Sequence, residues 1–162
     1  MKTRSLFRIL VILVPLICAD YTHAQNVKTC SWNAYGIKFK VPAGFRIVDS
    51  TTEVWKGTDE KITLDLFLHN ELKLSCRDLQ EIVYNWAVDS SLENIGKATN
   101  LDETQLNGYC GVMYLGDKND NPVAIMVLLD PDHPGLSLYI WVSYTEGCER
   151  PVQDMLLSFA PL

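Results

Sequence analysis

The segment 123–129, VAIMVLL, is the feature that most constrains the fold, because it is apolar at every position. A strand with one face in water alternates apolar and polar residues, whereas a strand covered on both faces is apolar throughout. Turns are predicted on either side, in KNDN at 118–121 and in DPDHPG at 130–135, since Asp, Asn, Pro and Gly favour tight turns. We therefore expect a central strand that is covered above and below.

Strands are predicted before and after this segment, at 103–117 and 136–145, and the short connections indicate an antiparallel meander. The first half of the chain also alternates in the manner of strands, at 35–42, 44–49, 52–57 and 61–69. In 35–42, GIKFKVP places Ile37, Phe39 and Val41 on the core side, and Lys38 and Lys40 outward.

Two amphipathic helices are expected. Residues 75–95 carry apolar side chains at helical spacing, with Ser75 as the predicted N-cap and Gly96 as the predicted stop, which gives about four turns. Residues 149–162 repeat the pattern more briefly, and Pro151 suits a first helical turn. The order strands, helix, strands, helix predicts an α+β fold in which an antiparallel sheet is covered by helices, an αβα sandwich.

The N-terminus predicts export. Residues 1–24 have a basic start, a short apolar run and small residues before a cleavage position after Ala24, as in a secretory signal peptide. The apolar run is much shorter than the ~20 residues of a spanning helix, so no membrane span is expected after cleavage. Residues 25–34 are interpreted as a short, partly ordered arm and residues 35–162 as a single domain, in a periplasmic or secreted protein.

Charge excludes some partners. The signal segment holds three basic side chains and one acidic one, so its removal changes the formal net charge from −6 to about −8. Without a cluster of Lys or Arg, nucleic acid and anionic membrane surfaces are not expected as partners.

Four cysteines remain after cleavage, Cys30, Cys76, Cys110 and Cys148, and an even number in an exported chain predicts two disulfides. If the meander turns near Asn119 and His133, Cys148 lies roughly 30 Å from Cys110, far beyond the ~7 Å limit between the Cα atoms of a disulfide. Pairing of Cys110 with Cys148 is therefore the least expected. Two connectivities stay open: Cys30–Cys110 with Cys76–Cys148, and Cys30–Cys148 with Cys76–Cys110.

No complete catalytic or metal motif is present, and no cofactor is expected. Residues 117–121 resemble the start of a calcium loop, but Pro122 replaces the required glycine, and a hairpin turn explains the same residues. Asp130, Asp132 and His133 could act as metal ligands or as an acid–base pair, although the prolines favour a rigid turn that could contact a partner.

Two further groups are candidates for contact. Asp65 and His69 share one strand face and could form a site beneath a covering element. Trp32 and Trp55 are the tryptophans expected to be exposed and able to stack on sugars, whereas Trp86 and Trp141 are expected in the core.

Three phrases in order along the chain resemble the PsbP-like fold, which includes the PsbP protein of photosystem II and the Ran-binding Mog protein. They are FKVPAGF at 39–45, LNG at 106–108 and MLLSF at 155–159. Members of that fold are mostly accessory or binding modules, so the resemblance implies no catalytic residue, and none is transferred.

Together these observations predict an exported, non-catalytic accessory or binding protein of the bacterial cell envelope, with an envelope protein as its partner. The alternatives are a small exported hydrolase that uses carboxylate or histidine chemistry, and a carbohydrate-binding module that uses Trp32 or Trp55.

Overall fold

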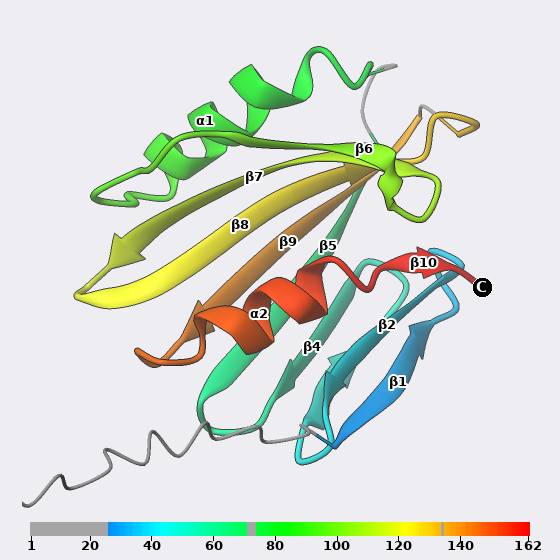
Figure 1. Ribbon diagram of the computed structural model, residues 1–162. Helices are drawn as coiled ribbons and strands as arrows, with labels where there is room; N and C mark the ends of the chain where they lie inside the picture. Colours follow the sequence, from blue (N-terminus) through cyan, green and yellow to red (C-terminus); the bar gives the residue numbers. More distant parts are fainter. Residues whose placement is uncertain (1–25, 71–73, 134) are drawn as a thin grey trace, which may run out of the picture.

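The computed structural model describes residues 26–70, 74–133 and 135–162. These residues form ten strands and two helices, whose arrangement is drawn in Figure 1. The strands are β1 (Val27–Trp32), β2 (Ile37–Pro42), β3 (Arg46–Ser50), β4 (Val54–Thr58), β5 (Ile62–Asn70), β6 (Thr99–Leu106), β7 (Tyr109–Lys118), β8 (Asn121–Leu129), β9 (Leu136–Tyr144) and β10 (Ala160–Pro161). The helices are α1 (Leu79–Asp89) and α2 (Glu149–Leu156).

The apolar segment 123–129 forms β8, inside a seven-stranded sheet of order β3-β4-β5-β9-β8-β7-β6 whose neighbouring strands are antiparallel. Every residue from Val123 to Leu129 is buried. Alternate side chains enter two different cores, with Ala124 and Met126 in one and Ile125 and Val127 in the other. The predicted central strand with two covered faces is confirmed.

The meander has the predicted register, but the single strand predicted at 103–117 was wrong, because a turn at Asn107 and Gly108 divides this segment between β6 and β7. Asn119 and Asp120 join β7 to β8 with φ values of 52° and 61°, as in the type I′ turns that suit the twist of paired strands. Cys110 pairs with Leu129, and Leu128 pairs with both Gly111 and Leu138.

A separate three-stranded sheet of order β1-β2-β10 was not expected from the sequence. In β2, Ile37, Phe39 and Val41 are buried and Lys38 and Lys40 are exposed, so the predicted register holds. Where the sequence predicted a partly ordered arm, residues 27–32 form β1, which pairs along the whole length of β2. Alternation over so few residues gave too weak a signal to predict this strand.

The inner core lies between the three-stranded sheet, α2 and one face of the seven-stranded sheet (Figure 1). Phe39 packs at its centre, with ring centroids 4.9 Å from both Phe159 and Trp55. Val152, Met155 and Leu156 bury the predicted apolar stripe of α2 here. The cover of this face is thus shared between a helix and a second sheet.

The outer core lies between α1 and the other face of the seven-stranded sheet, where Leu79, Val83 and Ala87 are buried. The predicted start and end of this helix were wrong. It begins at Leu79 with Asp78 as N-cap and ends at Asp89, well before Gly96. Ser75 instead donates from its backbone N–H and its hydroxyl to the Asp78 carboxylate, so the expected capping residue stabilises the preceding turn.

Cys76 and Cys110 form a disulfide with a Cα–Cα distance of 5.9 Å, which ties the entry of α1 to β7. Cys110 is therefore not bonded to Cys148. The register of the meander predicted this, since it places the two cysteines far apart. The pairing agrees with one of the two connectivities left open, but its second bridge is not formed, because Cys30 and Cys148 are free.

Candidate functional site

The sheet face that carries α1 extends beyond the helix. The helix packs on β7 and β8, whereas β4 and β5 lie farther along the same sheet (Figure 1). We call this uncovered part the open face and define it by Lys56, Thr63, Asp65, Phe67, Trp141 and Ser143, which are half-buried or exposed.

Strand register brings the open face together. Lys56 lies opposite Asp65, and Asp65 lies opposite Trp141 on the next strand. Thr63 lies opposite Ser143 in the neighbouring row. Side chains directly opposite one another across antiparallel strands share a face and interact, so residues more than 70 positions apart in the chain form one surface.

The indole of Trp141 is held at the boundary between the open face and the outer core. Its Nε1–H donates to the Ser143 hydroxyl at 2.9 Å, and the Trp86 ring packs edge-on at 5.9 Å between centroids. The Lys118 ammonium lies 5.1 Å from the Trp141 ring centroid and also donates to the Ser90 carbonyl at 3.0 Å. Since Ser90 is the C-cap of α1, Lys118 places a positive charge at the negative end of that helix.

Asp65 is the half-buried carboxylate of the open face. Burial raises its pKa, and the positive charge of Lys56 partly opposes this shift. The Lys56 ammonium lies 4.0 Å from the Asp65 carboxylate and 5.7 Å from the centre of the Phe67 ring. Charged side chains and an aromatic ring therefore lie next to one another on the open face.

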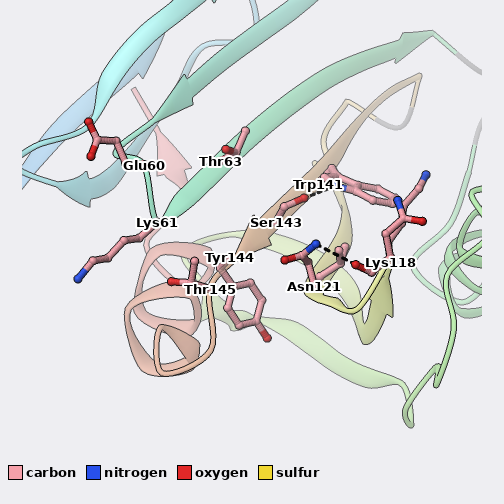
Figure 2. A pocket seen from close by; sticks show the side chains of 11 residues that line it. Glu60, Lys61, Thr63, Lys118, Asn121, Trp141, Ser143, Tyr144 and Thr145 are labelled. Atoms are coloured by element: carbon pink, nitrogen blue, oxygen red, sulfur yellow. Dashed lines mark hydrogen bonds between the residues drawn. The ribbon is translucent and has the colours of Figure 1, made fainter.

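A shallow hollow of about 460 Å³ opens at the end of this face, between the β4–β5 turn and the β7–β8 hairpin. Figure 2 shows Trp141 and Lys118 on one side and Glu60 and Lys61 on the other, with Thr63 and Ser143 along the strands between them. Sequence reasoning missed most of these residues, although it had singled out 117–121 as a turn.

Asp65 and His69 lie on the same sheet face, as predicted, but they do not form an acid–base pair. They are four residues apart on a continuous strand, roughly 13 Å at the usual rise, with Phe67 between them. His69 is exposed, and its ring centroid lies 4.3 Å from that of Tyr139.

Residues 130–133 form the predicted turn. The Asp130 carboxylate accepts the backbone N–H of Asp132 at 2.9 Å and contacts His133 Nδ1 at 2.9 Å. The hydrogen bond and charge of Asp130 raise the pKa of His133, which is exposed. This carboxylate–imidazole pair does not line the hollow, and its hydrogen bonds join residues within the turn.

Trp32 and Trp55 are not exposed, so this expectation was wrong. Trp32 is buried and its Nε1–H donates to the Thr51 carbonyl at 2.7 Å. Trp55 is fully buried beside Phe39 and Phe45. Neither can stack on a sugar, whereas Trp86 and Trp141, which were expected in the core, are partly exposed.

Residues 117–121, which resemble the start of a calcium loop, make hydrogen bonds within the protein. Asp117 accepts a hydrogen bond from the Asn94 amide at 2.9 Å, and the Asn121 amide donates to the Asn119 carbonyl at 3.0 Å. Within residues 26–70, 74–133 and 135–162, no three His, Cys, Asp or Glu side chains gather as a metal site would require. The same part of the chain holds no helix long and apolar enough to cross a membrane.

Comparison with known proteins defines the fold. No family model and no curated protein matches the sequence. Among solved structures, cyanobacterial PsbP from Synechocystis sp. PCC 6803 superposes with a TM-score of 0.60 at 16% identity, over 92% of this chain and 100% of that one. The Ran-binding protein Mog1p of Saccharomyces cerevisiae follows with a TM-score of 0.58 at 9% identity, over 84% and 95%.

A third structure is LpqN, described as involved in cell envelope biogenesis of Mycobacterium tuberculosis, with a TM-score of 0.52 at 10% identity over 85% of this chain and 86% of that one. The chain therefore has the α+β, PsbP-like fold that its three sequence phrases predicted. At these identities the likeness concerns the fold alone.

Proposed function

We propose that this protein is an exported, non-catalytic binding or accessory protein of the bacterial cell envelope, and that it engages its partner through the open face. The observation that carries the proposal is the incomplete cover of the sheet. Trp141, Phe67 and Asp65 remain accessible on a rigid sheet, although a helix covers the adjacent strands. Rigid elements that present aromatic and charged side chains together are suited to recognition.

Three further observations support this proposal. The leader at 1–24 has the features of a secretory signal peptide. The Cys76–Cys110 disulfide suits an oxidising compartment outside the cytoplasm. LpqN, a structural neighbour, is described as a cell envelope biogenesis protein.

The acid–base candidates favour binding over hydrolysis. A hydrolase site would place a histidine and carboxylates in one concave pocket. His133 and Asp130 are instead joined in an exposed turn, and His69 lies roughly 13 Å along the strand from Asp65.

The test is site-specific photo-crosslinking in the native envelope. A photo-reactive residue at Thr63, on the open face, is compared with one at Thr29, an exposed threonine on β1 of the other sheet. We expect a discrete adduct from Thr63 and none from Thr29, on a chain whose N-terminal sequencing starts at Gln25. Absence of a Thr63 adduct, or the same adducts from both positions, would contradict the proposal.

A further inference from the structure

The hollow beside Trp141 is rich in groups that can both donate and accept hydrogen bonds. Its walls carry the hydroxyls of Thr63, Ser143 and Thr145 and the amides of Asn119 and Asn121. Hydroxyl and amide side chains offer donors and acceptors at once, which matches a ligand that itself carries many hydroxyls. Thr63, Ser143, Thr145 and Asn121 each make one hydrogen bond within the protein, and each side chain has capacity for a further one to a ligand.

Trp141 supplies a flat apolar surface in the same hollow. The hydrogen bond to Ser143 and the edge contact with Trp86 hold its ring in place, so little conformational freedom is lost when a ligand packs against it. The face of an aromatic ring is negative and attracts weakly positive groups, as the position of Lys118 shows. The C–H face of a pyranose ring is such a group.

The charged side chains that line the hollow are two lysines and one glutamate. Lys61 and Lys118 both line it, and among the described residues no carboxylate lies within 4 Å of either ammonium group. Glu60, on the same rim, lies 3.8 Å from Arg46, so its charge already has a partner. Two lysines against one carboxylate, on a chain of formal net charge −6, favour a ligand with negative groups.

We propose that the hollow binds an acidic oligosaccharide, with a pyranose ring against Trp141 and separate carboxylates paired with Lys118 on one side of the hollow and with Lys61 on the other (Figure 2). The volume of about 460 Å³ is within the range of roughly 300–1,000 Å³ found for small-molecule sites. The inference rests on the proposed function, because it names the ligand chemistry of the open face. It assigns the saccharide contact to Trp141 in place of the buried Trp32 and Trp55.

The test is an NMR titration of the exported protein with tetragalacturonate, beside the same oligosaccharide with its carboxylates methyl-esterified. We expect saturable shifts of the Trp141 indole N–H and of the Thr63, Asn121 and Ser143 amides with the acid, and binding weaker by about tenfold with the ester. Lack of saturation with the acid, or equal affinity for the ester, would overturn the inference.

Two double variants that remove the same charge from different surfaces test whether the ligand binds in the hollow. Replacing Lys61 and Lys118 by Gln is expected to weaken tetragalacturonate binding by about tenfold or more. Replacing Lys38 and Lys40, which are exposed on β2 of the other sheet, removes the same charge and should leave the affinity unchanged. Equal losses in the two double variants would show nonspecific attraction and overturn the assignment.

Failure of this inference is distinguishable from failure of the proposed function. If Thr63 crosslinks to an envelope component while tetragalacturonate does not bind, the saccharide assignment is wrong and the open face remains a binding surface. If neither occurs, both proposals fail.

Discussion

The two cores of this protein are closed to different degrees, and their tryptophans show the contrast. In the inner core, Trp32 of the three-stranded sheet and Trp55 of the seven-stranded sheet are both buried. On the outer side, Trp86 and Trp141 remain partly exposed at the border of α1. The difference follows from the dimensions of the covering elements.

A seven-stranded sheet is roughly 29 Å wide at about 4.8 Å between strands. One helix, about 10 Å across, covers about two strands of it. On the inner side a second sheet adds the missing width. On the outer side α1 lies alone over β7 and β8, and the uncovered remainder is the open face. An accessible surface of this kind is a consequence of using one helix where about three would be needed to cover all seven strands.

The largest expected effect tests the closed side. Phe39→Ala should lower the free energy of unfolding by about 3–5 kcal/mol, because it opens a cavity between Phe159 and Trp55 in a core with no access to water. Trp86→Ala removes a larger side chain from the partly open side, yet it should cost only about 1–2 kcal/mol. Urea unfolding measures both, and equal losses would show that the two sides are equally closed.

The second prediction concerns the attachment of α1. The Cys76–Cys110 bridge spans a sequence separation of 34, and loop-closure entropy predicts a loss of about 3–4 kcal/mol when Cys76→Ser and Cys110→Ala are combined. Amide hydrogen exchange should increase most in α1, with little change in β2. Faster exchange in both cores alike would argue against separate closure of the two sides.

The third prediction concerns the boundary of the open face. Lys118→Met removes the hydrogen bond to the Ser90 carbonyl and the positive charge at the end of α1, which has no basic residue in its last turn. We expect a loss of about 1 kcal/mol in thermal or urea unfolding. Lys97→Met, at an exposed loop position, is the control and should have no measurable effect.

The smallest effect concerns Asp65 and depends on pH. Burial raises its folded-state pKa, so the charged carboxylate is disfavoured in the fold. The resulting loss of stability is absent below the unfolded pKa of about 3.9, where both states are protonated, and grows as pH rises towards the folded value.

Asp65→Asn should therefore be more stable than the wild type at pH 7 and equal to it at pH 3, as measured by urea unfolding at the two pH values. A variant that is less stable at pH 7 would show that the Lys56 contact outweighs the burial of the carboxylate.

Much of the local structure could be read from the residues. The uninterrupted apolar run 123–129 predicted a doubly covered strand, and Asn119-Asp120 predicted the hairpin, because side-chain burial and turn angles are local properties. The alternation in 37–41 predicted which side of β2 faces the core. The three phrases at 39–45, 106–108 and 155–159 indicated the PsbP-like fold, which the superpositions support.

The candidate site was less accessible to sequence reasoning. Thr63, Trp141 and Lys118 come from three different strands, and only strand register and the β7–β8 hairpin place them around one hollow. The exposure of a tryptophan depends on what lies over its strand, which the strand itself does not encode. For this reason the predicted exposure of Trp32 and Trp55 was wrong, whereas Trp86 and Trp141 pack against the outer core but remain partly exposed.

By itself, then, the sequence determined that both helices and most strands are present, which side of β2 faces the core, and the two-sided cover of the central strand, since each depends on residues that are neighbours in the chain. Only the tertiary structure decided that β1, β2 and β10 form a second sheet, that Cys76 pairs with Cys110, and that α1 leaves β4 and β5 uncovered. These outcomes depend on the relative widths and positions of distant elements. The open face, on which the proposed function rests, belongs to this second group.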